Sequence, residues 1–167
     1  GPRNRRASGV LAAVGRAGLE ARVITVPVDT PTPQRFAMGQ GSLDQARADA
    51  PFDGVFATDD LAAAEVLEWA RTRDLSVPGD LSIIGFDGTE SMRRALPHLA
   101  TIRQPIEHIA RAAVDLLLEQ LEGAARRPIH AAGAPPAPTL DFPGPLIRGR
   151  SLNLGRTLPH RPQPPSP

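Results

Sequence analysis

Carboxylates follow two apolar stretches that have the character of β-strands. The stretch GVFA runs into Thr58, Asp59 and Asp60, and the stretch LSIIGF runs into Asp87. In open parallel α/β sheets, ligands bind at the carboxyl ends of the strands, so we expect Thr58, Asp59 and Asp87 to share one edge of the sheet. Carboxylates there can accept hydrogen bonds from paired hydroxyls, such as a sugar or a nucleoside presents. The alternative is that Thr58 or Asp59 only caps the following helix.

Enzyme chemistry has little support in the sequence. Asp59, Asp60 and Asp87 can in principle hold Mg²⁺ or act as an acid–base pair, but either role needs a further ligand or nucleophile that the sequence does not offer. The chain has no cysteine, and its four histidines are scattered without metal-ligand spacing. The motifs GxGxxG, HExxH and GxSxG and the P-loop are absent. We therefore expect no enzymatic activity, no bound metal and no cofactor.

Three arginines, Arg3, Arg5 and Arg6, crowd the start of the first predicted helix. Because a helix N-terminus is already partly positive, cations there are mildly unfavourable unless an acidic or hydroxyl-rich group lies nearby. We expect Arg3 and Arg5 to be solvated surface charges and Arg6 to contact a ligand.

Helices and strands alternate along residues 1–123 and must position these side chains. Helices are predicted near residues 5–17 with Gly18 as the stop, from the capping-box spacing of Ser42 and Gln45, at 60–73, and at 105–123. Strands are predicted at 22–27, 54–57 and 81–86. Strands that are apolar throughout and separated by helices indicate an α/β fold with a parallel sheet covered on both faces.

Composition separates the chain into two parts. The 167 residues suffice for one domain or two small lobes. Residues 1–123 carry a net charge of −4, whereas residues 124–167 carry +5 and hold 11 of the 19 prolines. A stretch so rich in Pro and Ala cannot pack a core of its own. The basic tail therefore gives no evidence for a nucleic-acid-binding face, and no run of about 18 apolar residues exists to cross a membrane.

Several phrases resemble, in order and spacing, the effector-binding part of the LacI/GalR family of bacterial transcription regulators. They are FDGVFATDDLA (52–62), VPGDLSIIGFD (77–87) and LATIRQP (99–105). RASG at 6–9 resembles the family's Arg-x-x-Gly-aromatic turn, and LIRGRS at 146–151 resembles its terminal strand. The resemblance thus divides the chain into a sensor-domain fragment (1–123), a Pro/Ala-rich insertion (124–144), a terminal strand (145–152) and a disordered tail (153–167).

The resemblance implies the fold of the type I periplasmic binding proteins, in which two α/β lobes hold an effector in the cleft between them. The chain matches a truncated form of it, mainly the C-terminal lobe plus one crossing helix. By this resemblance, we expect it to begin after the family's helix-turn-helix, after the first lobe and after the first strand of the second lobe. The helix at 105–122 normally packs on the first lobe, so we expect it to fold against the remaining sheet, to pair with another chain or to stay mobile.

Position by position, the resemblance implies an effector site. Arg6 matches the arginine that typically holds effector hydroxyls, and Asp87 matches the aspartate that typically receives a pair of sugar hydroxyls. Thr58 lies where Asn or Ser is usual, beside Asp59, and Gln104 matches a residue at the crossing between the lobes.

Three departures from the family pattern bear on specificity. Thr58 lacks the amide donor of an asparagine, Gly88 replaces a frequent second aspartate, and Val10 replaces the aromatic residue after Gly9. Phe36, on the next loop, is the candidate for the missing wall of the site.

The function implied is the ligand-sensing portion of a cytoplasmic, homodimeric DNA-binding regulator. A sugar or other polyol would bind between the lobes and control operator binding by the absent helix-turn-helix. Residues 60–73 and 91–97 are the expected dimer surfaces, and Trp69 is either a core residue or an interface anchor. Two alternatives stay open: a periplasmic sugar-binding protein of a transport system, and a degenerate fragment without activity.

Overall fold

Nine helices and strands make up the described part of the chain. A computed structural model describes residues 2–26, 32–125 and 140–153. The helices are α1 (Pro2–Arg16), α2 (Thr32–Asp49), α3 (Asp60–Arg71), α4 (Glu90–Ala95) and α5 (Ile106–Ala125). The strands are β1 (Gly54–Phe56), β2 (Ser82–Asp87), β3 (Ala100–Arg103) and β4 (Leu146–Ile147). None of the helices in these ranges has the length and hydropathy of a membrane span.

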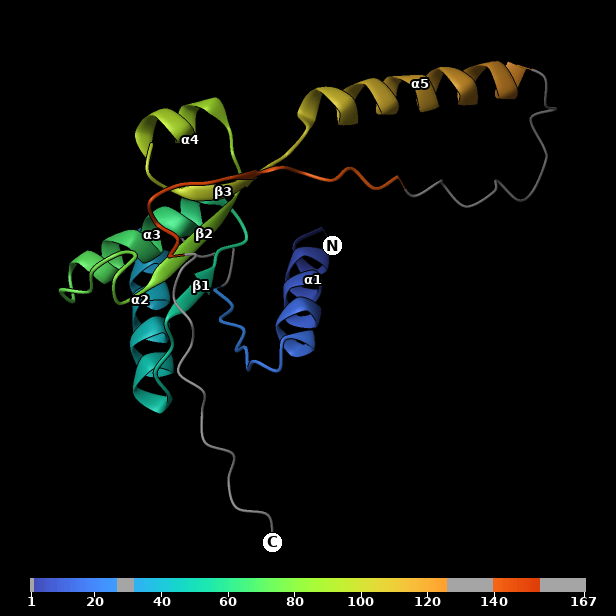
Figure 1. Ribbon diagram of the computed structural model, residues 1–167. Coiled ribbons are helices and arrows are strands. Elements are labelled where there is room, and N and C mark those ends of the chain that lie inside the picture. The colour runs from blue at the N-terminus through green and yellow to red at the C-terminus, as the bar shows by residue number, and fades with distance from the viewer. Residues whose placement is uncertain (1, 27–31, 126–139, 154–167) are drawn as a thin grey trace, which may run out of the picture.

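The strands form one sheet in the order β1-β2-β3-β4 (Figure 1). β1, β2 and β3 are parallel, with Phe56 opposite Ile84 and Ile84 opposite Ala100. β4 is antiparallel to β3, with Ile147 opposite Thr101. The sheet is therefore mixed and not wholly parallel.

Only one face of the sheet is fully covered. Ile83 and Gly85 are buried under α3, whereas Ile84 and Phe86, which point to the opposite face, are half-buried. The second face is therefore covered less completely than the sequence predicts. α1 lies on the second side of the sheet (Figure 1) and reaches it through the guanidinium of Arg6, which lies over the Phe86 ring.

The core lies between the covered face, α3 and α2. Trp69 of α3 is fully buried, stacks on Phe52 with ring centroids 6.0 Å apart, and donates its indole N–H to Asp44 of α2 at 2.9 Å. This indole bond satisfies the one polar atom of a large apolar side chain. Of the two roles considered for Trp69, the core role is confirmed.

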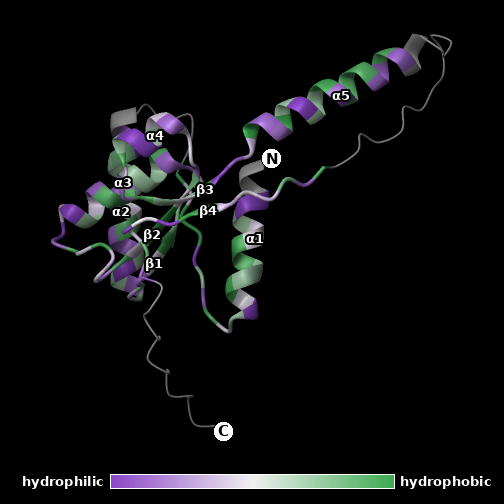
Figure 2. Ribbon diagram, turned by 45° about the horizontal axis from the view of Figure 1, so that its top comes forward, coloured by the Kyte–Doolittle hydropathy of each residue, from purple (hydrophilic) through white to green (hydrophobic). Residues whose placement is uncertain are grey.

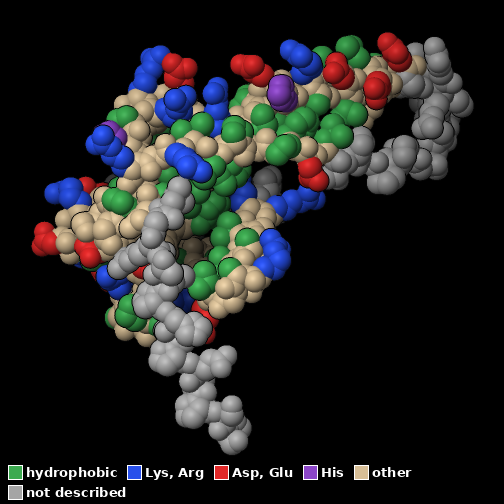
Figure 3. Space-filling view, in the orientation of Figure 1, with side chains coloured by type: hydrophobic (Ala, Val, Ile, Leu, Met, Phe, Trp, Pro, Cys, Tyr) green, Lys and Arg blue, Asp and Glu red, His purple; other side chains and the backbone are tan. Residues whose placement is uncertain are grey.

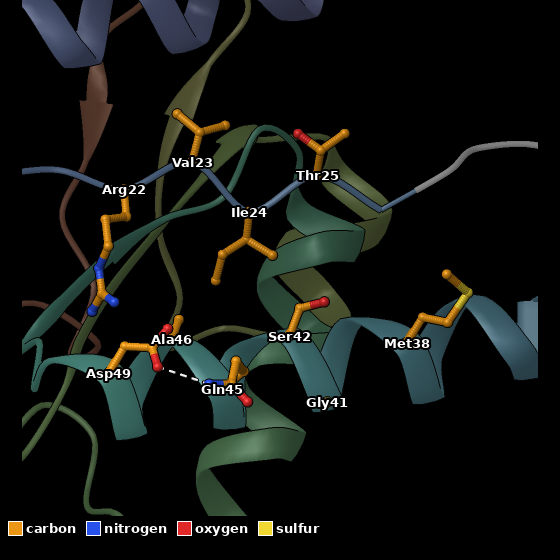
Figure 4. Close-up of a pocket in the computed structure, with 10 residues that line it drawn as sticks. All are labelled: Arg22, Val23, Ile24, Thr25, Met38, Gly41, Ser42, Gln45, Ala46 and Asp49. Carbon is orange, nitrogen blue, oxygen red and sulfur yellow. Dashed lines mark hydrogen bonds between the residues drawn. The ribbon is translucent and has the colours of Figure 1, made fainter.

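The strand predicted at residues 22–27 is absent. Residues 22–26 are irregular, Val23 is 60% exposed, and Pro27 lies outside the described residues. The segment runs beside α2 (Figure 4), and it takes no part in the strand pairing found among the described residues. A sequence of strand character forms a strand only where a neighbouring backbone pairs with it.

The helix boundaries agree with prediction at Gly18 and differ at several others: α1 begins at Pro2 and α3 ends at Arg71. α2 runs through Ser42, which is an interior residue and not a helix start, because Leu43 docks in the core as part of the continuous helix. α5 continues past Gly123 to Ala125. Gly18, at φ +69°, ends α1 as predicted, with the Leu19 amide bonded to the Val14 carbonyl.

The C-terminal stretch is tied into the sheet by Ser151. Its hydroxyl donates to the Ile83 carbonyl and accepts from the Ala100 amide, both at 2.7 Å, and it is buried. β4 covers two residues of the predicted terminal strand. Most of the predicted insertion and tail, at 126–139 and 154–167, lies outside the described residues.

α5 projects from the body as a long helix (Figure 1) and does not fold against the sheet. No side chain along residues 106–122 is buried. Apolar side chains gather along the lower flank of α5 in Figure 3, and hydrophobic residues recur along the helix in Figure 2. The first of the three expectations for this helix, packing on the remaining sheet, was therefore wrong.

Candidate functional site

The carboxyl ends of the three parallel strands bring the predicted site residues to one edge. Thr58 comes just after β1, Asp87 ends β2, and Gln104 follows β3. The Gln104 amide donates to the Asp87 carbonyl at 3.0 Å, and the Gln104 side-chain amide donates to the Asp87 carboxylate. Thr58, Asp87 and Gln104 are each half-buried, so the edge is shaped by the fold and still open to solvent.

Arg6 of α1 completes this edge from the less covered side of the sheet. Its Nη1 donates to the Thr58 carbonyl at 2.7 Å and lies 3.6 Å from Oδ1 of Asp87. Its guanidinium carbon lies 4.1 Å above the centroid of the Phe86 ring, a cation–π contact that holds the group flat. Arg6 is thus placed by a carbonyl, a carboxylate and an aromatic face. These contacts offset the unfavourable position of a cation near a helix N-terminus.

The Arg6 and Asp87 side chains leave room for a competing ligand. The 3.6 Å between Nη1 and Oδ1 is an ion-pair contact, longer than a hydrogen bond. The two side chains are 23% and 29% exposed, so water or a ligand can reach both. The pair presents donors and an acceptor next to one another, which suits hydroxyl groups because each hydroxyl can donate and accept.

Asp59 caps the helix that follows it, which is the alternative role that the sequence analysis considered. It is the N-cap of α3, and its Oδ1 accepts from the Ala62 amide at 2.8 Å. This bond satisfies one of the free amides at the helix start. Asp59 lies beside Thr58 in the chain, but none of the hydrogen bonds or ion pairs among the described residues joins its side chain to Arg6 or Asp87.

Asp87 is followed by a short helix, which the sequence analysis did not foresee. Thr89, and not Asp87, is the N-cap of α4, and its hydroxyl accepts from the Met92 amide at 3.4 Å. A cap in the chain after Asp87 leaves the Asp87 carboxylate available to the site. No apolar helical pattern marks α4 in the sequence, because the helix is only six residues long and none of its side chains is buried.

Gly88 has a structural reason to be glycine. Its φ is +61°, and a Cβ there would lie 2.8 Å from the Arg103 Cα and 2.9 Å from its Cβ. The second aspartate that is frequent in the resembling family would meet the Arg103 backbone in this structure.

Phe36 is not brought to the site by any contact that the structure describes. It lies on α2, where it is half-buried, and no aromatic or cation contact among the described residues joins it to Arg6 or Asp87. The aromatic group that does contact Arg6 is Phe86, which the sequence analysis treated only as part of a strand. Its position one residue before Asp87, on the face opposite Gly85, was the signal that could have identified it.

A separate groove lies between residues 22–25 and α2 (Figure 4). It has a volume of about 560 Å³ and is broadly open. Ile24 points toward α2 in this view, and the groove contains none of the predicted site residues. Among the described residues no cluster of three or more metal-ligating side chains is present.

A protein-family model matches most of this chain, and two known repressors match less than half of it. Residues 1–151 match the family described as periplasmic binding protein-like domain. The sucrose operon repressor of Streptococcus mutans is 41% identical over 70 residues, which are 42% of this chain and 22% of that protein. The HTH-type transcriptional repressor CytR of Escherichia coli is 44% identical over 73 residues, which are 44% of this chain and 21% of that protein.

Solved structures share the fold. The crystal structure of a LacI family transcriptional regulator from Arthrobacter sp. FB24 superposes with a TM-score of 0.67 at 24% identity, over 89% of this chain and 51% of that one. Its complex with lactose gives a TM-score of 0.65 at 24% identity, over 86% and 49%. The chain thus spans about half the length of these solved relatives, and its matches cover about a fifth of each of the two repressors.

Proposed function

Because the chain belongs to the periplasmic binding protein-like domain family, in the form carried by LacI-family regulators, we propose that it senses a small hydroxylated effector. The observation that carries the proposal is the edge at which the Arg6 guanidinium lies 3.6 Å from the Asp87 carboxylate. A sugar hydroxyl placed there would accept from Arg6 and donate to Asp87. The lactose complex of a protein with the same fold supports a sugar-like ligand.

The neighbouring residues take supporting parts in this proposal. Gln104 orients the Asp87 carboxylate through its side-chain amide and offers a further donor. Thr58 fixes Arg6 through its carbonyl and presents a hydroxyl. Asp59 caps the start of α3 next to Thr58 through Oδ1. In this proposal its Oδ2 accepts from an effector hydroxyl. Phe36 would act as a wall only if α2 faced a bound effector.

In the complete regulator, we propose, effector binding between two lobes changes the lobe angle and so the affinity of a DNA-binding head for its operator. The protein would act in the cytoplasm as a homodimer, with α3 and residues 91–97 at the dimer surface and without catalytic activity or a cofactor. The repressor names of the two relatives favour this function over that of a sugar-binding protein of a transport system.

Isothermal titration calorimetry against lactose, cellobiose and sucrose tests the proposal. The chain, and any longer polypeptide that its gene encodes, would be titrated in unmodified form, as Asp87→Ala and as the matched exposed control Asp53→Ala. We expect binding of at least one sugar, a loss of about tenfold or more in affinity for Asp87→Ala, and no change for Asp53→Ala. Unchanged affinity in Asp87→Ala, or no heat with any sugar, would contradict it.

A further inference from the structure

One buried carboxylate, Asp60, lies next to the candidate site, and the proposed function gives it no role. Asp60, the first residue of α3, is 2% exposed. Its Oδ1 accepts from the Thr101 hydroxyl at 2.6 Å, and its Oδ2 accepts from the Gly88 amide at 2.8 Å. Both partners are themselves buried. A carboxylate at the first position of a helix is favoured by the helix dipole, and here both of its oxygens are used.

The surrounding sequence makes space for this carboxylate. A Cβ on Gly85 would lie 2.4 Å from Asp60 Oδ1, so any larger residue there would displace it. Thr101 points to the same face of the sheet as Gly85, since the two residues are paired between β2 and β3. Asp60 therefore joins three elements at one point: the start of α3, the end of β2 and the middle of β3.

Asp60 binds the backbone turn at residues 87–88, and the conformation of this turn sets the direction of the Asp87 side chain. Asp87 has φ 118° and Gly88 has φ +61°, so two successive residues lie in the region that favours glycine. A non-glycine residue at positive φ is strained and persists only where its surroundings hold it. Two hydrogen bonds to this backbone do so: the Asp60 carboxylate accepts from the Gly88 amide, and the Gln104 backbone amide donates to the Asp87 carbonyl.

We propose that Asp60 is a positioning residue for the effector site. By holding the Gly88 amide, it sets the backbone turn that directs the Asp87 carboxylate to Arg6 and Gln104. The inference rests on the proposed function, since it assigns Asp60 a task within that site. Without Asp60 the strained turn relaxes, Asp87 turns away from Gln104, and the hydroxyl-binding edge loses its acceptor.

The test compares variants that keep or remove the bond to Gly88. Asp60→Ala removes it. Asp60→Asn has the same shape, and its carbonyl can still accept from Gly88 while its amide donates to the Thr101 hydroxyl. Asp60→Ser serves if Asp60→Ala does not fold, because serine suits a helix start but its hydroxyl is too short to reach both partners. Asp53→Ala is the exposed control.

Two measurements follow each variant. Nuclear magnetic resonance of the chain without any ligand reports the Gly88 amide and the side-chain amide of Gln104. Calorimetry with lactose reports affinity. We expect Asp60→Ala or Asp60→Ser to move both amide signals toward those of free amides and to lower lactose affinity about tenfold or more. Asp60→Asn should restore both amide signals and the affinity to within about threefold.

The outcomes separate the two proposals. Unchanged Gly88 and Gln104 signals in folded Asp60→Ala or Asp60→Ser would overturn the positioning role, whatever the sugar affinity. Moved signals with unchanged lactose affinity would also overturn it. Absence of sugar binding by the unmodified protein would instead overturn the proposed function.

Discussion

The C-terminal stretch packs so closely against the backbone at residues 98–100 that position 149 has no room for a side chain. A Cβ on Gly149 would lie 2.4 Å from the His98 carbonyl oxygen and 2.5 Å from both the Ala100 nitrogen and the Leu99 carbonyl carbon. All three atoms are backbone, so they cannot move aside as a flexible side chain would. The close approach also places Ser151, two residues later, within reach of β2 and β3.

Gly149→Ala should therefore lower the free energy of unfolding by about 1–3 kcal/mol, the usual cost of overpacking. Gly41→Ala is the matched control, because Gly41 is exposed within α2 and its Cβ would meet no atom within 4 Å. The control should gain about 0.5–1 kcal/mol, since alanine favours a helix. Urea unfolding followed by Trp69 fluorescence measures both, and equal effects would contradict the packing argument.

Asp59 allows capping and ligand binding to be separated. Asp59→Ala should cost about 1 kcal/mol of stability, because the Ala62 amide loses its acceptor. Asp59→Ser keeps a capping oxygen and should restore most of that loss. If Asp59 also binds effector, Asp59→Ser should regain stability but not sugar affinity. Thermal melting and calorimetry on the same samples measure the two effects, and recovery of both would leave Asp59 as a cap alone.

At the scale of elements, α2 is linked to α3 and the residues just after it by Asp44, whose carboxylate binds both the Arg73 guanidinium and the Trp69 indole N–H. Arg73 donates to Asp44 through Nε at 2.6 Å and Nη2 at 2.5 Å, and Trp69 donates to the same carboxylate at 2.9 Å. The Arg73 guanidinium, followed by the Trp69 indole, holds the pKa of Asp44 below its ordinary value of 3.8. Asp44 is therefore charged more readily in the folded chain than in the unfolded chain.

A lowered carboxyl pKa stabilises the fold above the unfolded value and ceases to do so as the pH falls through the folded value. Asp44→Asn should cost less than about 1 kcal/mol at pH 7, because the pair is partly exposed. The difference from the unmodified chain should shrink below about pH 4. Urea unfolding at pH 7, 5 and 3 measures it, with Asp53→Asn as control. A difference that is constant over this range would contradict the charge argument.

The elements that sequence analysis predicted correctly are those whose sequence patterns lie within the element itself or next to it. The strands β1 and β2 follow from apolar stretches, and α3 follows from Asp59 and the helix pattern after it. The strand expected at 22–27 needed a neighbour that the sequence could not guarantee, and the capping-box spacing at Ser42 was overridden when Leu43 docked in the core. The antiparallel direction of β4 depends on its pairing with β3, which no local pattern encodes.

The same reasoning explains the site. Thr58, Asp59 and Asp87 were predicted at one edge because strand ends and parallel order can be inferred from sequence, whereas Gln104 was predicted only from the resemblance. Asp60 was foreseen only as a metal or acid–base candidate. Its actual bonds, to Thr101 and Gly88, join residues 41 and 28 positions away along the chain. Tertiary contacts of that range decide whether a carboxylate faces a ligand or is enclosed by the fold.

At the scale of the whole molecule, stability is unevenly distributed between the body and α5. β2 is buried at Ile83 and Gly85 under α3 and bonded on both sides by β1 and β3. α5 has no buried side chain over residues 106–122, and Leu121 is 59% exposed. Most of the stability of a protein helix comes from the packing of its apolar face, and α5 has little such packing among the described residues.

The rates of hydrogen–deuterium exchange should therefore differ between α5 and the body of the molecule. Amides of α5 should exchange about 100-fold faster or more than those of β2, because they open locally without unfolding the core. α3 is the internal control: it is also helical, but its packing against β2 should give its amides protection close to that of the sheet. Equal protection of α5 and α3 would show that the apolar flank of α5 is covered in solution. Uniformly fast exchange of β2, α3 and α5 would instead favour the degenerate fragment, since a binding edge at the strand ends requires a body that stays folded.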